Sequence, residues 1–502
     1  MRHLKEIKKL IQFPRTQIQL MFQKKSIQQK LFNSTFKIQH STFIIQHSKL
    51  EVLMLSSIKI FLAFTTTLLI LFTNLSCHRT PIEPEKTKVN LIYEDALCTE
   101  AYFRLKTTEI NYPARVDLYL NKDKVNSFTT FSDDTVFVIE NLLPKKSYTS
   151  YVRVYPEGGG ELVSSEVSFV TMDTTSHDFT WQVFEFGQWG NSVLFDVAII
   201  DENNIWAVGE IRVYDSLGRE VKYNAVHWNG SKWELKRIYH YSSCNPVDYP
   251  PFRSIIAFSD KEIILTSGGS IGWFNGITNR TDCGIRPLLT GRINKLWGTS
   301  SSDLYAVGDN GNIVHWDGMR WKKIESGTDI RLTDIWGTSD GKIVWACGWD
   351  LNKTVLVKIE NNQASVVFEA NLPTQEIKNK LSGVLNSLWT NNNKFVYILT
   401  WANLYRCYNN TKGDGRELYP SNDYFMGAYL RLRGTSINNL FTCGHKSTIT
   451  HFNGLSWKIY GELRNEDQIL TGLDVSDNLV VAVGEKFEGL FNNKALIIVG
   501  KR

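Results

Sequence analysis

Histidines recur at one position in the second half of the chain, in a pattern that could bind a metal ion. His227, His315 and His451 each lie two residues before an Asn-Gly or Asp-Gly pair. Imidazole nitrogens are common zinc ligands, and three of them suffice for a catalytic site if they converge on one point. The elements that carry these residues therefore decide whether they form a metal site.

Aromatic side chains and one arginine form a second recurring set. Trp297, Trp336 and Trp389, with Arg433 next in the series, each follow an apolar residue that recurs along the chain. Exposed at one mouth of a channel, these side chains would make a stacking surface for a sugar or a peptide. Packing between neighbouring repeat units is the alternative, and it is the one we favour.

Carboxylates lie beside the same recurring apolar residues, where they could take part in hydrolysis. The three are Asp196, Asp334 and Asp474, but their register differs by one residue between copies, and no pair has a spacing that indicates a general acid and base. The sequence also lacks the GxSxG, HExxH, P-loop, paired CxxC and EF-hand patterns. We therefore predict no catalytic residue, no metal and no cofactor, and an enzyme is the less favoured hypothesis.

Two of the seven cysteines differ from the others in their surroundings. Cys244 and Cys283 lie in polar loops, YSSCNP and RTDCGI, at similar places in successive repeat units. An exported protein meets compartments that allow oxidation, so these two are candidates for a disulfide, with two free thiols as the alternative. Four others lie in apolar, strand-like runs and are predicted to be buried thiols: Cys98, Cys347, Cys407 and Cys443.

The element that carries most of these residues is a repeat of about 40 to 50 residues, a length typical of propeller blades. In its clearest copy, residues 293–325, four strand-like runs are joined by GTSSSD, DNG and DG turns, as in one four-stranded antiparallel blade. Copies follow one another over residues 179–502 at spacings of 39 to 59 residues. Their recurring apolar residues are Val197, Ile256, Leu296, Ile335, Leu388, Leu432 and Leu473. The repeat therefore predicts an all-β chain that ends in a seven-bladed β-propeller.

A propeller gives the repeated histidines and glycines structural roles. Equivalent positions of different blades lie far apart around a ring, so the three histidines cannot share one ion. A glycine ends the second strand of most copies, as Gly308 and Gly348 do. We expect the backbone to turn there with positive φ, which glycine adopts without strain.

The ring also has a predicted closure. The run TWQVFEF at residues 180–186 resembles the fourth strands of the repeat but precedes the first copy, whereas the last copy has no fourth strand. The N-terminal strand should therefore complete the last blade and remove its exposed edge, without a disulfide.

A smaller β domain is predicted over residues 89–172. Six short runs there alternate apolar and polar residues, as half-buried antiparallel strands do. Leu143, Pro144 and Tyr148 resemble the LxPxxxY corner of fibronectin type III domains, an immunoglobulin-like sandwich. That resemblance implies a Tyr148 hydroxyl bonded back to the backbone, and Tyr102 or Phe103 in place of a core tryptophan. The fold by itself implies no ligand, and we expect the domain to act as a spacer.

The first 88 residues are interpreted as targeting sequence. Residues 54–76 contain one lysine, an apolar run over 60–72 that is short for a membrane span, and a small residue before Cys77. This pattern predicts a signal peptide and resembles the lipobox of bacterial lipoproteins, although Asn74 stands where that family prefers leucine. The resemblance implies lipidation of Cys77, followed by a tether over 77–88. Secretion without lipid and an uncleaved helix are the alternatives.

The segment before the signal peptide is unlike the rest of the chain. Residues 34–47 consist of the tandem heptads STFKIQH and STFIIQH, which have no amphipathic pattern. We predict that residues 1–53 are a mis-annotated or disordered extension and that Met54 is the true start. A genuine basic extension is the alternative.

The distribution of charge argues against a nucleic-acid partner. The formal net charge is +5, but residues 1–76 hold 11 of the 56 basic residues and only 2 of the 51 acidic ones. The remainder has 45 basic and 49 acidic residues, so a mature exported chain is slightly acidic. We therefore predict no nucleic acid among the partners.

The repeats resemble the WGTS and YAVG propellers of exported bacterial lipoproteins over about residues 179–502. The resemblance implies a monomeric, non-catalytic lipoprotein anchored in the outer membrane of a Gram-negative bacterium, at the cell surface or facing the periplasm. Its propeller would present a binding face for carbohydrate, peptide or a protein partner. The alternative is a carbohydrate-active enzyme, a glycoside hydrolase or a lyase, with carboxylates at the channel mouth. The pattern does not identify the ligand.

Overall fold

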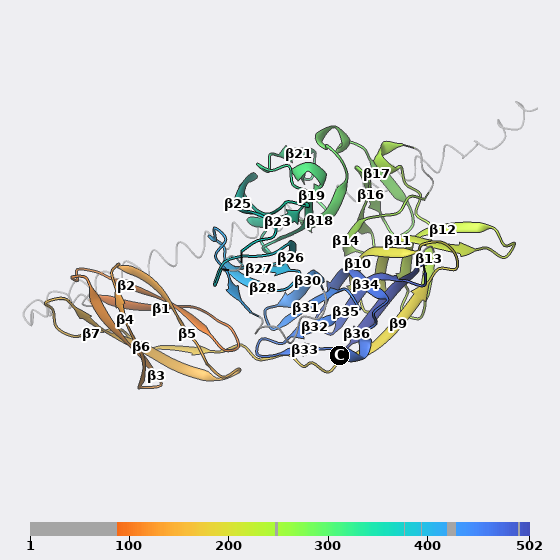
Figure 1. The fold of residues 1–502 in the computed structure, drawn as a ribbon. Coiled ribbons are helices and arrows are strands. Elements are labelled where there is room, and N and C mark those ends of the chain that lie inside the picture. The colour runs from red at the N-terminus through yellow and green to blue at the C-terminus, as the bar shows by residue number, and fades with distance from the viewer. Residues whose placement is uncertain (1–87, 246–248, 376, 393, 419–427, 490–491) are drawn as a thin grey trace, which may run out of the picture. The chain divides into compact units, whose positions relative to one another are not determined.

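The computed structural model describes residues 88–245, 249–375, 377–392, 394–418, 428–489 and 492–502. The regular secondary structure of these residues is almost entirely β-strand, with a few short 3₁₀ helices (Figure 1). The contacts divide the chain into residues 1–86 and 87–502. The predicted signal peptide and Cys77 lie outside the described residues. No helix within the described ranges is long and apolar enough to cross a membrane.

The N-terminal domain consists of two antiparallel sheets around one apolar core. One sheet has the order β1-β2-β5 and the other the order β4-β3-β6-β7, with β8 also paired to β6. The strands are β1 (Val89–Ala96), β2 (Ala101–Thr107), β3 (Ala114–Leu120), β4 (Asp123–Thr130), β5 (Asp134–Ile139), β6 (Ser147–Pro156), β7 (Leu162–Val163) and β8 (Val167–Val170). Alternate residues point into the core, as they do along β6, where Tyr148, Val152 and Val154 are buried.

Tyr148 ties the corner of this domain together. Its hydroxyl accepts a hydrogen bond from the backbone N–H of Leu143 at 2.9 Å, and its ring stacks on Phe169 with centroids 5.5 Å apart. Phe103 is fully buried in the same core and meets Phe169 edge-on. Its neighbour Tyr102 points to the other face of β2, because successive strand residues alternate, and packs against Phe395 of the C-terminal domain.

Seven four-stranded antiparallel sheets make up the described part of the C-terminal domain. The first three contain β10 (Val193–Asp201), β11 (Asn204–Tyr214), β12 (Glu220–Trp228) and β13 (Trp233–Lys236); β14 (Ser254–Ser259), β15 (Glu262–Ser267), β16 (Ser270–Phe274) and β17 (Asn279–Asp282); and β18 (Ile293–Ser300), β19 (Asp303–Gly308), β20 (Ile313–Trp316) and β21 (Trp321–Ile324). The next three contain β22 (Leu332–Gly337), β23 (Ile343–Trp349), β24 (Lys353–Glu360) and β25 (Gln363–Asn371); β26 (Leu385–Trp389), β27 (Phe395–Thr400), β28 (Leu404–Tyr408) and β29 (Arg416–Glu417); and β30 (Tyr429–Ser436), β31 (Asn439–Gly444), β32 (Ile449–Phe452) and β33 (Trp457–Ile459). The last contains β34 (Gln468–Val475), β35 (Leu479–Lys486), β36 (Lys494–Lys501) and β9 (Thr180–Phe186).

The first strands of these sheets form the inner ring of a β-propeller. Each contacts the first strand of the next sheet, and β34 contacts β10, so the series closes on itself. Apolar clusters fill the space between successive sheets, which explains why the second strands are buried along most of their length. This is the radial arrangement that the repeat predicts.

The closing strand lies where the repeat places it. Strand β9 pairs with β36 in antiparallel register, from Thr180 opposite Lys501 to Phe186 opposite Ala495. The ring of Trp181 lies where a Cβ on Gly500 would stand, so the absence of a side chain at Gly500 lets this strand approach. The predicted closure by residues 180–186 is confirmed.

The expectation of positive φ at the recurring glycines was wrong for most copies. Gly308 has φ −164°, which is extended backbone, whereas Gly268 has φ 60°. The cause is a register shift near the start of the neighbouring first strand. It brings the carbonyl oxygen of Arg292 against the position that a Cβ on Gly308 would occupy. Glycine is needed there because two backbones approach closely, not because the chain turns.

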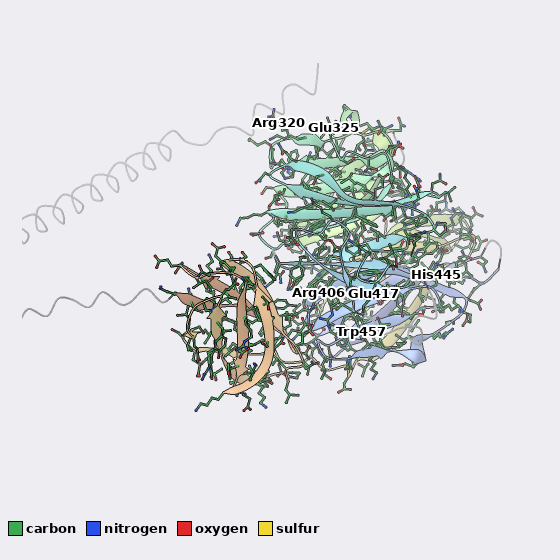
Figure 2. The ribbon with its side chains drawn as sticks, turned by 60° about the vertical axis from the view of Figure 1, so that its left-hand side comes forward. Arg320, Glu325, Arg406, Glu417, His445 and Trp457 are labelled. Carbon is green, nitrogen blue, oxygen red and sulfur yellow. A yellow bond between two sulfur atoms is a disulfide. The ribbon has the colours of Figure 1, made fainter. Side chains whose placement is uncertain are left out.

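The N-terminal domain packs directly on the propeller. Leu97 and Tyr102 belong to an apolar cluster shared with Phe395 and Trp389. The buried carboxylate of Glu100 lies beside this cluster and forms two ion pairs. Its oxygens lie 2.8 Å from a guanidinium nitrogen of Arg406, which is labelled in Figure 2, and 3.0 Å from one of Arg416. The expected spacer is thus a docked domain, held by apolar burial together with a buried ion pair.

Candidate functional site

Charged side chains fill the centre of the ring. Asp196 and Lys295 lie at equivalent register positions, just after the irregularities of β10 and β18, and Ser254 lies between them on β14. The Lys295 Nζ is 2.6 Å from both Asp196 carboxylate oxygens, and the Ser254 hydroxyl donates to Asp196 Oδ2 at 2.8 Å. All three side chains are buried. Asp196 therefore joins three successive sheets.

The same arrangement recurs on the next three sheets. Arg433 of β30 makes a two-pronged ion pair with Asp334 of β22, with N–O distances of 2.8 and 3.0 Å. Ser387 of β26 donates to the same carboxylate and accepts the backbone N–H of Leu432. Burial opposes the charge of Asp334, but Arg433 and Arg431 overcome it and hold the pKa of Asp334 well below its usual value.

Asp474, on the seventh sheet, differs from these two carboxylates. Its two oxygens accept backbone N–H groups, from Ile199 of the first sheet at 2.7 Å and from Val475 at 2.9 Å. Burial raises the pKa of Asp474 to about 6, and these hydrogen bonds offset that only in part. The centre thus contains two carboxylates that pair with buried cations and a third, Asp474, whose pKa is raised by burial. The two carboxylates committed to ion pairs do not supply the free acid and base of a glycosidase.

The tryptophans predicted from the repeat are mostly buried. The Trp297 ring covers Gly337 of the next sheet, and Trp389 Nε1 donates to the Gly434 carbonyl of the next sheet at 2.8 Å. Trp336 is half-buried, and the Arg433 guanidinium lies over its ring, 4.6 Å from the ring centroid. Arg433 itself is 2% exposed. Trp297 and Trp389 thus connect successive sheets, and Arg433 connects the sixth sheet to the fourth, so these side chains pack the ring together.

The repeated histidines serve the fold in the same way in each copy. The Nε2 atoms of His227, His315 and His451 meet an Asn or Asp oxygen at the start of the second strand, at 2.9, 2.7 and 3.2 Å. Each ring also stacks on an aromatic ring of that strand, with centroids 4.1 to 4.3 Å apart. Among the described residues, no group of three or more metal-ligating side chains comes together.

An exposed aromatic groove lies between the fourth and fifth sheets. Trp349 ends β23, and Trp401 follows β27; their rings meet edge-on with centroids 5.6 Å apart. Trp401 is 44% exposed and Leu351 at the rim is 90% exposed. The hollow has a volume of about 520 Å³ and is lined by Trp349, Asp350, Leu351, Leu372, Pro373, Thr374, Ser382, Gly383, Val384, Thr400, Trp401, Ala402 and Asn403. We call it the Trp349/Trp401 groove.

The polar side chains of this groove are largely engaged within the protein. The hydroxyl of Ser382 and the amide of Asn403 both bond the Tyr405 hydroxyl, at 2.9 and 3.3 Å. Asp350 Oδ1 accepts two backbone N–H groups of its own turn. Outside the hollow, the Arg331 guanidinium lies 5.3 Å from the Trp349 ring centroid. The groove therefore offers mainly apolar surface to a ligand.

Sequence reasoning missed this groove, although a signal was present. Trp349 and Trp401 occupy the same repeat position, directly after Gly348 and Thr400, which pair with the first residues of β22 and β26. The position after the recurring glycine identifies Trp349, and alignment of the repeats identifies Trp401, because Thr400 replaces the glycine in the fifth copy. Their exposure, in contrast, depends on how residues 372–374 and 382–384 pack beside them, which no local pattern indicates.

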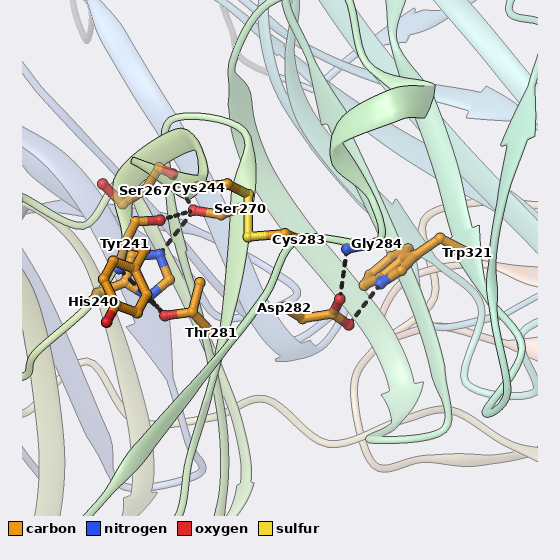
Figure 3. The surroundings of a disulfide bond; sticks show 10 residues. All are labelled: His240, Tyr241, Cys244, Ser267, Ser270, Thr281, Asp282, Cys283, Gly284 and Trp321. Atoms are coloured by element: carbon orange, nitrogen blue, oxygen red, sulfur yellow. Dashed lines mark hydrogen bonds between the residues drawn. A yellow bond between two sulfur atoms is a disulfide. The ribbon is translucent and has the colours of Figure 1, made fainter. Parts of the chain in front are cut away.

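The two loop cysteines are joined by a disulfide in the structure (Figure 3). Cys244 lies in the long connection before β14, and Cys283 follows β17, so the bond holds this connection against the outer edge of the second sheet. His240 is buried beside it, with Nε2 2.9 Å from the Ser270 hydroxyl and Nδ1 3.0 Å from that of Thr281. Burial lowers the pKa of His240 to about 4, so its ring is neutral at pH 7. Free cysteines at positions 98, 347, 407 and 443 are buried.

Comparison with known proteins identifies no family. No family model and no curated protein matches the sequence. Among solved structures, YCF48 bound to D1 peptide has a TM-score of 0.46 at 12% identity, covering 66% of this chain and all of that one. YCF48 from Cyanidioschyzon merolae has a TM-score of 0.45 at 12% identity over 63% and 98%. The extracellular domain of the putative one component system BT4673 from B. thetaiotaomicron has a TM-score of 0.43 at 10% identity over 64% and 40%. These similarities are too distant to assign a function.

Proposed function

We propose that this protein is an exported, lipid-anchored binding protein without catalytic activity, whose propeller holds an apolar segment of a peptide or protein partner in the Trp349/Trp401 groove. The observation that carries the proposal is the edge-on tryptophan pair at the groove, in which Trp401 is exposed and Trp349 is half-buried. Exposed tryptophans anchor partners because each ring buries a large area at small cost in side-chain entropy.

The chemistry of the groove favours a peptide over a sugar. A sugar needs free hydrogen-bonding side chains for its hydroxyls, whereas Ser382 and Asn403 are engaged within the protein and Asp350 commits one carboxylate oxygen to its own turn. An extended peptide can place a proline or aliphatic side chain between aromatic rings and leave its backbone in water. The buried ion pairs at the centre of the ring stabilise the scaffold and take no part in binding.

The domain assignment forms part of the same proposal. The bond from the Leu143 N–H to the Tyr148 hydroxyl supports a fibronectin type III-like sandwich for residues 89–172. The seven sheets and the pairing of β9 with β36 support a seven-bladed propeller over residues 179–502. With a lipid on Cys77, the tether over 77–88 would hold both domains at the outer membrane, at the surface or facing the periplasm.

A peptide selection tests the groove. Residues 78–502 are used to select from a phage-displayed peptide library, and the selected peptides are measured against Trp401→Ala and Leu351→Ser. We expect apolar peptides whose affinity falls about tenfold or more in either variant, because a buried aromatic or leucine contact is worth about 1.5–3 kcal/mol. Ile277→Ser is the matched control, since Ile277 is 88% exposed on another sheet. Peptides that bind equally to all variants would contradict the proposal.

A further inference from the structure

A second and larger hollow lies where the N-terminal domain meets the propeller. It has a volume of about 860 Å³, within the range of about 300 to 1,000 Å³ that small-molecule sites occupy. It opens between β1 and β2 on one side and the residues around β27 and β28 on the other. The lining residues that the argument uses are Glu94, Asp95, Lys394, Tyr408, Asn409 and Asn410.

One exposed aromatic side chain, that of Tyr408, lines this hollow. Tyr408 ends β28 and is 48% exposed, whereas most aromatic rings of the inner strands are buried. Phe395 packs against it with ring centroids 4.9 Å apart, which holds the ring in place. A fixed, half-exposed tyrosine is a stacking platform for an apolar ring face.

Side-chain amides lie directly beside the platform. Asn409 is 8% exposed, and neither its amide nitrogen nor its carbonyl oxygen has a hydrogen-bond partner within the described residues. Buried side-chain amides nearly always have hydrogen-bond partners. The unpaired nitrogen and oxygen of Asn409 therefore indicate a partner beyond the described residues. Asn410 is exposed next to it. Asp95 uses Oδ1 to accept the Ala96 N–H at 2.8 Å, and its Oδ2 has no hydrogen bond to any of the described residues.

Apart from Asp95, the charged side chains that line the hollow are already paired, which favours an uncharged ligand. Glu94 lies 2.7 Å from Arg104 and 3.0 Å from Lys394, and Lys358 lies 3.0 Å from Glu360. A charged ligand would have to displace one of these partners. An uncharged ligand with many hydroxyls needs none of them and can use the free amides and the Asp95 oxygen.

We propose that this hollow binds a short neutral oligosaccharide. One sugar ring stacks its apolar face on Tyr408, and its hydroxyl groups exchange hydrogen bonds with the amide of Asn410 and with Asp95. The Asn409 amide, whose polar atoms are buried, joins them when its side chain turns toward the ligand. This site is separate from the Trp349/Trp401 groove and has the opposite character, since its free groups are polar where those of the groove are apolar. The N-terminal domain supplies one wall, so the site exists only while the two domains are docked.

Calorimetric titration of residues 78–502, which include the whole compact unit 87–502, tests the proposal. The probes are maltotriose, cellotriose, xylotriose, mannotriose and chitotriose, titrated one at a time. We expect saturable binding of at least one trisaccharide. Tyr408→Ala should weaken it about tenfold through loss of stacking, and Asn410→Ala should weaken it by a smaller factor.

Two controls separate stacking at this site from other effects. Tyr408→Phe keeps the ring and should keep most of the affinity. Trp401→Ala, which is expected to weaken only peptide binding in the other groove, should leave the trisaccharide affinity unchanged. Thermal melting of each variant establishes that it is folded, and Asn410 is exposed, so its variant should melt as the parent does. The proposal is overturned if no trisaccharide saturates the protein, if binding survives Tyr408→Ala, or if Trp401→Ala abolishes it.

Discussion

The Lys295 ammonium lies 2.6 Å from both carboxylate oxygens of Asp196, a residue 99 positions earlier in the chain. Arg433 makes a similar ion pair with Asp334, again 99 positions earlier, although it lies two residues beyond the register position of Lys295. In both cases a serine of the intervening sheet bonds the same carboxylate. Each pair therefore ties the first and third of three successive sheets together across the ring centre. Because these charges are buried, they matter to stability only as complete pairs.

Replacing Lys295 by methionine should strongly destabilise the propeller. The variant leaves the Asp196 carboxylate buried without its cation, and breaking a buried pair in this way costs about 3–5 kcal/mol. Urea unfolding followed by tryptophan fluorescence measures the effect. The double variant Asp196→Leu with Lys295→Met should recover much of the loss, since it removes both charges.

Lys323→Met is the matched control for this experiment. Lys323 pairs with Glu325 at 3.0 Å on an outer strand, where both side chains are exposed. Such surface pairs contribute about 0–1 kcal/mol, so this variant should unfold almost as the parent does. Equal effects of Lys295→Met and Lys323→Met would show that the central pair is not important for stability.

Asp474→Asn should gain stability relative to the parent as pH rises from 4 to 7. Burial raises the pKa of Asp474 from its ordinary value of 3.8 to about 6. The folded state therefore binds the proton more tightly than the unfolded state does. The associated stability is complete below pH 3.8 and is lost as pH rises through 6. Asparagine retains an acceptor for the Ile199 N–H and has no charge to bury. Melting temperatures across this pH range measure the difference.

Asp317→Asn is a control in which the pKa shift of the replaced carboxylate, and therefore the pH dependence of stability, has the opposite sign. Lys322, 2.6 Å away, and two backbone N–H groups hold the pKa of Asp317 below its ordinary value. Its stabilisation is therefore present above the ordinary pKa and is lost as pH falls. The turn should survive, because asparagine occupies the equivalent positions 229 and 453. If both variants showed the same pH dependence, the pKa assigned to Asp474 would be wrong.

Removing the disulfide should lower the free energy of unfolding of the second sheet. Cys244 and Cys283 are separated by 39 residues, and the chain-entropy model gives about 4 kcal/mol for a closed loop of that length. The variant with Cys244→Ser and Cys283→Ser should therefore melt earlier than the parent. Mass spectrometry after thiol alkylation of the unfolded, unreduced protein checks the bond itself. Alkylation of either residue in protein from an oxidising compartment would refute it.

A chain that begins at residue 188 should fail to close, whereas one that begins at residue 178 should close. The two chains share the loss of the N-terminal domain and differ only in β9, whose absence leaves the edge of β36 unpaired. Size-exclusion chromatography should show the shorter chain aggregating and the longer one as a single species. Identical behaviour would mean that the clasp is dispensable.

Lipidation of Cys77 is a prediction from sequence that mass spectrometry can test. The mature N-terminal peptide from the membrane fraction should begin at Cys77 and carry acyl chains, and Cys77→Ser should yield unacylated protein. Binding to the membrane then follows from the acyl chains, since each buried CH₂ contributes about 0.8 kcal/mol. A mature N-terminus upstream of Met54 would contradict both the start site and the anchor.

What the sequence could determine was local. Strand alternation, the Gly-containing turns and the recurring apolar residues of each unit are set by neighbours in the chain, because side chains alternate every residue along a strand. These patterns predicted the propeller, its closure by residues 180–186 and the structural role of His227, His315 and His451. The blade count and the fibronectin type III assignment stay predictions.

Only the tertiary structure decided where side chains from different sheets meet. Lys295 and Asp196 lie 99 residues apart, and their contact depends on the angle between sheets and on a register shift in each inner strand. The same shifts explain why Gly308 needs no positive φ. Burial of Trp389 and exposure of Trp401 likewise depend on which loops cover each sheet. Local patterns do not encode such placements, because a strand's sequence specifies its two faces but not what packs against them.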